Sequence, residues 1–325
     1  MISRRTVLTG GLASGLALTI IGRAEQAFAL SSQPFTPVNF KVPANACDCH
    51  THIHGDPAKY PFFDGRVYTP EAALPTEMAA LHKRLGIKRV VIVTPSVYGP
   101  DNASTLYGVK ARGKNARGVA VIDNRTARCE LDDMDDGGIV GIRLNLTTGG
   151  TNDPKVAGER FDAAVKRIRE RGWHVQIYTN LAMISAIKDQ VRTSPVPVVF
   201  DHFGGARANL GVEQPGFSDL LDLLRTGKVY VKISAAYRSS TEGPDYANAA
   251  PLAKALIAAN PSRIIWGTDW PHPNSTPPAG QKLSDVTPSF QIDDGRVMNQ
   301  LAVWAPEAAL RRRILVDNPE ELYGF

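Results

Sequence analysis

The sequence has few cysteines, and their spacing organises neither a fold nor a metal site. There are three, Cys47, Cys49 and Cys129, and an odd number excludes a disulfide framework as the basis of the fold. Cys47 and Cys49 stand two residues apart in an expected strand, where a bridge between them would be strained. Their spacing is not that of a zinc site either. We therefore expect all three cysteines to be small packing residues.

The chain also lacks a strong charge of either sign, since its formal net charge is +5 over 325 residues. It has no basic stripe interleaved with aromatic residues, so nucleic acid is not an expected partner. Beyond residue 29, no segment is apolar for long enough to span a bilayer. No Gly-x-Gly-x-x-Gly pattern follows an expected strand, which disfavours a doubly wound dinucleotide-binding sheet.

Residues 1–29 carry the pattern of an export signal. Arg4 and Arg5 precede a short, glycine-rich apolar run, and Ala27-Phe28-Ala29 follows as a small-residue cleavage signal. Paired arginines before a weakly apolar segment are typical of a twin-arginine signal peptide. The run of about 13 to 14 residues is short for a membrane anchor, which needs ~20. We expect export by the twin-arginine machinery, cleavage near Ala29, and a periplasmic or otherwise exported protein.

After an extended, proline-containing lead-in at residues 30–45, the chain alternates between apolar runs and amphipathic stretches to residue 325. Continuous apolar runs are typical of parallel strands that are buried on both faces. Apolar positions at helical spacing predict helices at 160–171 and 217–226. The expected strands are residues 46–51, 89–94, 117–122, 139–145, 173–179, 197–202, 228–234 and 263–268. Eight such units in residues 46–325 predict a single α/β domain, a closed (β/α)8 barrel, with a doubly wound sheet as the alternative.

In such a barrel the chemistry gathers at the carboxyl ends of the strands, where several polar residues fall here. Alternation along the first strand predicts that Asp48, His50 and His52 point to one side, and Cys49 and Thr51 to the other. The other strand ends carry Ser96, Arg143, Tyr178, His202, Arg238 and Asp269. One such histidine is more often structural, but the convergence of three histidines, an aspartate and two arginines predicts an active site. The proline-rich loops at 54–76 and 271–290 are expected to be lids or binding loops.

These motifs resemble the amidohydrolase superfamily (amidohydrolase-related, family 2), in the branch of 2-pyrone-4,6-dicarboxylate lactonase. The likeness runs from Asp48 to Pro319. Its most specific segments are Asp48-Cys49-His50-Thr51-His52, Gly141-Ile142-Arg143-Leu144-Asn145, Val199-Phe200-Asp201-His202 and residues 265–273. The segment at 37–45 further resembles the galactarolactone isomerases of the same group.

The resemblance implies a role for each residue at the strand ends. Asp269 would be the general base, while His50, His52 and His202 would polarise a lactone carbonyl. The residues that would hold the substrate are Tyr68, Ser96, Arg143, Tyr178 and Arg238. The chain departs from the lactonase at Gly149 and Gly205, where that enzyme has further arginines that grip its substrate. Arg207, two residues beyond, is a candidate replacement.

The same comparison bears on metal. Arg143 and Tyr178 stand where binuclear amidohydrolases need a bridging lysine or glutamate and a histidine, and a permanent guanidinium charge repels a cation. A binuclear centre is therefore not expected. One divalent ion such as Zn²⁺ on His50, His52 and Asp269 stays open. The branch resembled here works without metal, so we favour no cofactor.

The expected function is a hydrolase that opens a small carboxylated lactone, with Asp269 accepting a proton from the attacking water. Arg143 and Arg238 would orient the substrate carboxylate through paired hydrogen bonds. The alternatives are a lactone isomerase of the galactarolactone type and an exported binding protein without turnover. A related decarboxylase is less favoured because it would need a metal. No oligomeric state is predicted.

Overall fold

The computed structural model describes residues 35–148 and 153–325. The expected signal peptide at 1–29 and the first residues of the lead-in lie outside this part. Within it, no helix combines the length and the apolar character that crossing a membrane requires.

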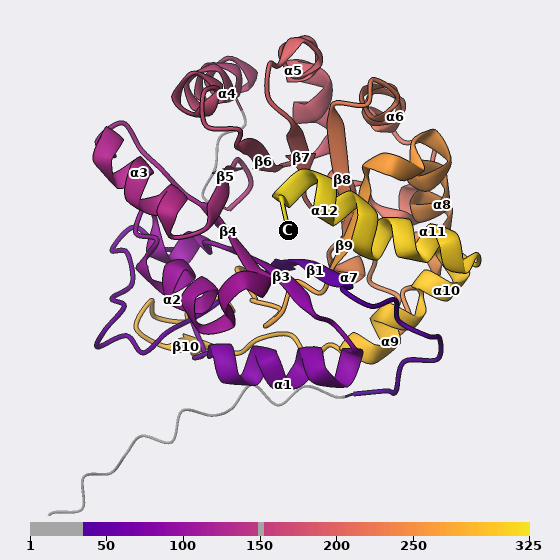
Figure 1. Ribbon diagram of the computed structural model, residues 1–325, viewed down its shortest axis with the longest axis horizontal. Coiled ribbons are helices and arrows are strands. Elements are labelled where there is room, and N and C mark those ends of the chain that lie inside the picture. The colour runs from indigo at the N-terminus through magenta and orange to yellow at the C-terminus, as the bar shows by residue number, and fades with distance from the viewer. Residues whose placement is uncertain (1–34, 149–152) are drawn as a thin grey trace, which may run out of the picture.

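Eight parallel strands follow one another around a barrel, as Figure 1 shows in a view along its axis. The ring closes between its first and last strands, where the Asp269 amide donates to the His50 carbonyl at 2.8 Å and the His52 amide donates to the Trp270 carbonyl at 2.8 Å. The strands are β1 (Cys47–Thr51), β3 (Arg89–Val93), β4 (Ala116–Ala120), β5 (Ile139–Asn145), β6 (His174–Tyr178), β7 (Val198–Phe200), β8 (Val229–Ser234) and β9 (Ile264–Gly267). Each overlaps an expected strand, and the (β/α)8 prediction is confirmed.

Helices surround the ring (Figure 1), and apolar side chains of most of them belong to the core that covers it. They are α1 (Pro75–Leu85), α2 (Ala103–Arg112), α3 (Arg128–Asp136), α4 (Pro154–Ile168), α5 (Leu181–Thr193), α6 (Phe217–Arg225), α7 (Ala236–Ser239), α8 (Ala250–Ala259), α9 (Asp294–Asn299), α10 (Leu301–Trp304), α11 (Ala308–Arg312) and α12 (Asn318–Tyr323). The two predicted helices correspond to α4 and α6. Helix α4 starts earlier than expected because Asp153 caps the amide of Lys155 and Pro154 opens its first turn.

The amino end of the barrel interior is apolar. Cys47 and Cys49 pack there with valines of the neighbouring strands, and Tyr323 of α12 is buried in the same cluster. Figure 1 shows the C-terminus lying over the centre of the ring. The expectation for these two cysteines is therefore confirmed. It is wrong for Cys129, which lies exposed on α3, whose buried side is formed by other residues.

The expected alternation along β1 fails at Asp48. The pairing of β1 with β3 shifts register between Asp48 and Thr51, and such irregularities re-aim side chains near active sites. Asp48 accepts hydrogen bonds from His82 of α1 (3.2 Å) and from the Thr268 hydroxyl (2.6 Å), so it faces away from the barrel mouth. Cys49 and His50 both reach the interior.

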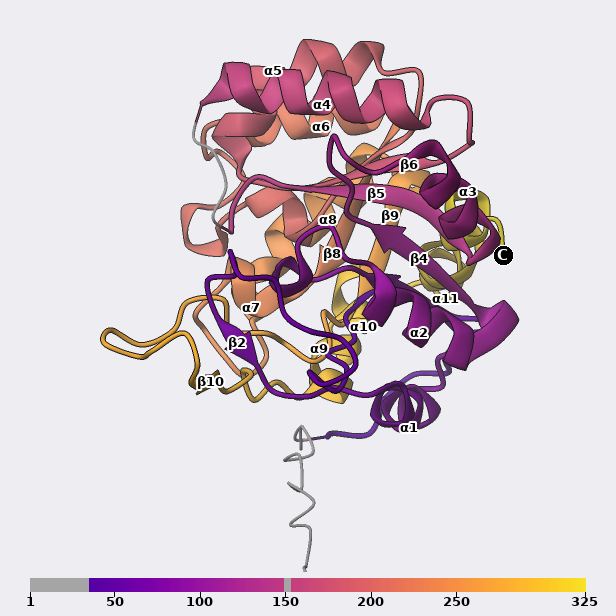
Figure 2. The same ribbon diagram turned by 90° about the vertical axis from the view of Figure 1, so that its left-hand side faces the viewer.

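The two long loops meet beside the barrel mouth. Each contains a two-residue strand, β2 (Thr69–Pro70) and β10 (Val286–Thr287), and the two pair in parallel. Figure 2 shows both at the same side of the molecule. They place Tyr68 and Ser275 next to the carboxyl ends of the strands.

Candidate active site

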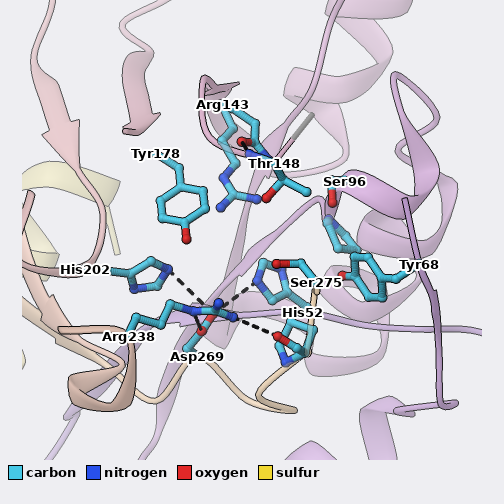
Figure 3. A pocket seen from close by; sticks show the side chains of 13 residues that line it. His52, Tyr68, Ser96, Arg143, Thr148, Tyr178, His202, Arg238, Asp269 and Ser275 are labelled. Carbon is cyan, nitrogen blue, oxygen red and sulfur yellow. Dashed lines mark hydrogen bonds and ion pairs between the residues drawn. The ribbon is translucent and has the colours of Figure 1, made fainter. Parts of the chain in front are cut away.

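A pocket opens at the carboxyl ends of the strands (Figure 3). Its lining comprises His52, Tyr68, Pro95, Ser96, Arg143, Asn145, Thr148, Tyr178, His202, Arg238, Asp269, Pro273 and Ser275. Every predicted site residue except His50 is among them. His50 lies fully buried beneath, with its Nε2 atom 3.5 Å from Asp269 Oδ1.

Asp269 presents its two carboxylate oxygens to different surroundings. Oδ2 accepts hydrogen bonds from the Tyr237 hydroxyl at 2.6 Å and from Arg238 Nε at 2.7 Å. Oδ1 has no hydrogen-bond partner among the described residues. It faces Nε2 of His52 at 3.3 Å and Nε2 of His202 at 3.8 Å. Oδ1 is thus the carboxylate oxygen that is left to accept a hydrogen bond from a ligand or water.

The charge state of Asp269 follows from its neighbours. Burial alone would raise the pKa of this carboxyl, but the Arg238 charge and the nearby histidines hold the pKa well below its usual value. The same pair raises the pKa of Arg238 well above its ordinary range, although burial opposes this. Asp269 is therefore a carboxylate at neutral pH, ready to accept a hydrogen bond from water.

The histidines around Asp269 differ in how they are held. Burial lowers the pKa of His202 to about 4, and burial together with the Lys232 charge lowers that of His50 well below its usual value. Both rings are neutral at pH 7. Nδ1 of His52 lies 2.7 Å from the Val93 carbonyl, which only accepts, so this nitrogen carries a proton.

The two predicted arginines reach the pocket, but Arg238 is not a free anion clamp. Besides its bond to Asp269, it donates through Nη2 to the Pro273 carbonyl at 3.0 Å. Arg143 is buried, with Nε 3.4 Å from Asp201 Oδ2 and its guanidinium against the Tyr178 ring. Burial raises the pKa of Tyr68 to about 12, so its hydroxyl stays protonated and can donate to a ligand.

Sequence reasoning missed residues on both sides of Asp269. Tyr237, next to Arg238, binds Oδ2, and a buried group of Asp201, Gln176 and Lys232 lies beneath His50. The available signal was chemical: Lys232 is a charged residue within an apolar strand, and such residues are rarely buried without a partner.

The structure describes one of the two positions, Gly205, at which the chain departs from the lactonase pattern. Gly205 has φ +75°, and a Cβ there would lie 2.4 Å from the Thr179 carbonyl oxygen, so this backbone does not accommodate a side chain. Gly149 lies outside the described residues. Arg207 is exposed and does not line the pocket, and its guanidinium lies 3.5 Å from the Arg238 carbonyl.

One set of residues has the arrangement of a metal site. Ligand atoms of His50, His202 and Asp269 lie within 4.8 Å of one another, which differs from the expected set by His202 in place of His52. A metal-bound histidine usually donates its other N–H to an acceptor. Nδ1 of His50 lies 3.2 Å from both Asp201 Oδ1 and the Lys232 ammonium, but only the lysine, which donates, has acceptable hydrogen-bond geometry. The ammonium beside His50 and the Arg238 guanidinium beside Asp269 therefore do not fit this set as the ligands of a cation.

Comparisons with known proteins place the chain among lactone-converting enzymes. Residues 47–325 match a family model described as amidohydrolase. A 4-sulfomuconolactone hydrolase of Hydrogenophaga intermedia is 34% identical over 89% of this chain and 91% of its own length. A 2-pyrone-4,6-dicarboxylate hydrolase of Comamonas testosteroni is 34% identical over 87% and 92%. A D-galactarolactone isomerase of Agrobacterium fabrum is 29% identical over 89% and 94%.

Proposed function

The chain belongs to the amidohydrolase family, and we propose that it is a hydrolase that opens a small anionic lactone. The observation that carries this proposal is the Asp269 carboxylate on the pocket wall. One of its oxygens is held by Arg238 and Tyr237, and the other faces the pocket without a hydrogen-bond partner among the described residues. A carboxylate held in this way can orient a water molecule and accept its proton.

The reaction then needs no group beyond the chain, the lactone and water. Water bound at Asp269 Oδ1 attacks the ring carbonyl, and its proton passes to the carboxylate. Histidine N–H groups meet the negative charge that develops on the carbonyl oxygen, a contribution of ~3 to 4 kcal/mol per donor. The ring C–O bond breaks, and Asp269 returns the proton to the leaving oxygen.

The charges around the pocket support an anionic substituent on the substrate. Among the described residues of the site, Arg143, Lys232 and Arg238 are accompanied by two carboxylates, Asp201 and Asp269, so one positive charge remains uncompensated. A carboxylate or sulfonate of the ligand would neutralise it. Both hydrolase relatives are named for lactones or pyrones with such groups.

We also propose that the enzyme works without a resident metal, because the Lys232 ammonium and the Arg238 guanidinium adjoin two of the three possible ligands. The proposed export of the protein rests on Arg4, Arg5 and the Ala27-Phe28-Ala29 signal. Lactone isomerisation is the second candidate, favoured by the likeness to the galactarolactone isomerase. Incorporation of oxygen-18 from solvent water into the product separates hydrolysis from isomerisation.

The proposal is tested by a pH-indicator assay over muconolactones, pyrone carboxylates and aldarolactones, with Asp269→Asn as the comparison. The amide keeps the shape of the side chain but cannot accept the proton. We expect a loss of at least ~10²-fold in turnover for the best substrate. Retention of more than about a tenth of the activity would remove Asp269 from this role.

A further inference from the structure

Lys232 lies fully buried inside the barrel, directly beneath the pocket. Its ammonium donates to Gln176 Oε1 at 2.7 Å and lies 3.2 Å from His50 Nδ1 and 3.4 Å from Asp201 Oδ1. Gln176 and His50 thus accept from two of the three N–H groups of the ammonium, and Asp201 lies at ion-pair distance. A buried ammonium needs such partners, because an unpaired charge would cost several kcal/mol. The mechanism above uses this lysine in no step.

Two groups compete for Nδ1 of His50, and they require opposite protonation of the ring. Asp201 Oδ1 lies 3.2 Å away and, as an acceptor, would need a proton on Nδ1. However, this oxygen has no hydrogen bond of acceptable direction among the described residues, so it lies off the line of a ring N–H. The Lys232 ammonium has acceptable hydrogen-bond geometry and needs a lone pair on Nδ1.

We propose that Lys232 is a positioning residue that holds neutral His50 with its proton on Nε2. This N–H points toward the active centre, where Nε2 lies 3.5 Å from Asp269 Oδ1 and has no hydrogen-bond partner among the described side chains and backbone. It is therefore a free donor for a carbonyl oxygen or for bound water. The proposal deepens the proposed function, since the donor acts on the lactone of that reaction.

His52 is held by a different group, although it stands only two residues from His50. Its Nδ1 atom donates to the Val93 carbonyl at 2.7 Å, and its Nε2 atom lies 3.3 Å from the same carboxylate oxygen. The backbone thus orients His52, whereas the lysine orients His50.

Substitution of Lys232 by Met tests this assignment. Without the ammonium, Asp201 is the remaining polar partner of Nδ1, so the ring proton moves to Nδ1 and a lone pair faces the pocket. We expect kcat to fall by ~10²- to 10³-fold, as for loss of one oxyanion donor, while KM changes much less. The matched control is Gln176→Met, which removes another partner of Lys232 and leaves the bond to His50 in place. It should keep most of the activity.

The decisive readout is the tautomer itself, measured without substrate by NMR of protein labelled with ¹⁵N-histidine, with His50→Gln to assign the signal. The wild type and Gln176→Met should show a proton on Nε2 of His50, and Lys232→Met a proton on Nδ1. A wild-type proton on Nδ1, a metal ion on Nε2, or an unchanged tautomer in Lys232→Met would each overturn the proposal. The wild-type spectrum decides even if Lys232→Met does not fold. An inactive panel with the expected tautomer would count against the proposed function alone.

Discussion

Arg238 donates through Nε to Oδ2 of Asp269 at 2.7 Å, which joins two residues that the sequence assigned to separate tasks. The arginine was expected to grip the substrate and the aspartate to activate water. Because they form a buried ion pair, the arginine also sets how strongly the carboxylate holds a proton. Substitution at Arg238 should therefore affect turnover as well as binding.

We expect Arg238→Met to lower kcat/KM by a factor that corresponds to ~2 to 5 kcal/mol of transition-state stabilisation. A clear part of this loss should be in kcat. Removal of the positive charge raises the pKa of Asp269, so the acid limb of the pH–kcat profile should move to higher pH. Arg238→Lys, which keeps the charge, should shift that limb far less. A rise in KM alone, with kcat and its pH profile unchanged, would show that the ion pair has no part in turnover.

A second prediction concerns stability in acid, because His54 and His174 are buried. Burial lowers the pKa of His54 and of His174 to about 3, whereas an unfolded histidine titrates near 6.5. As the pH falls below about 6.5, these histidines bind protons in the unfolded chain but stay neutral in the folded chain. Each such histidine then costs about 1.4 kcal/mol of unfolding free energy per pH unit.

Urea unfolding between pH 6.5 and 5 measures this loss in a range where most carboxylates stay ionised. The free energy of unfolding should decrease steadily as the pH is lowered through this window. His174→Gln removes one of the titrating groups, so its slope should be smaller by up to one proton. A slope that is flat in the wild type, or equal in the variant, would contradict the assignment of neutral buried rings.

The strands were predictable because most are short apolar runs that end in polar residues, and the barrel brings those ends together. The direction of the Asp48 side chain was not predictable, because it depends on a register shift in β1 that the side-chain pattern does not encode. The partner of Arg238 was hidden for a similar reason. It depends on the short helix α7, entered through Ala235 at φ +50°, which turns Tyr237 and Arg238 toward Asp269.

The third prediction concerns metal content. Lys232 adjoins His50, and Arg238 adjoins Asp269. A divalent metal ion bound to these residues would be repelled by the two positive side chains, and a pair of metal ions would be repelled more strongly. Purified enzyme should hold at most one equivalent of divalent metal, and dialysis against a chelator should leave kcat unchanged. Two equivalents, or activity that a chelator removes and Zn²⁺ restores, would contradict the charge argument.

The last prediction concerns Gly205, one of the positions at which an arginine is missing. Its φ of +75° is one that residues with a side chain rarely adopt, and an added Cβ would lie 2.4 Å from the Thr179 carbonyl and 2.8 Å from Asn180 Cα. Both neighbours are backbone atoms, which cannot rotate away. Gly205→Ala should therefore destabilise the protein by more than the ~1 kcal/mol that a positive φ alone costs.

Gly227 is the matched control, because its φ is +76° but an added Cβ would meet nothing within 4 Å. The difference in unfolding free energy between Gly205→Ala and Gly227→Ala isolates the close approach of the 205 backbone to Thr179. If the two variants are equally stable, the loop at 205 yields easily, and an arginine there could be accommodated. If Gly205→Ala is the less stable, as we expect, Gly205→Arg should lower the melting temperature without improving turnover of dicarboxylate lactones. The backbone itself then prevents a second arginine grip at this position.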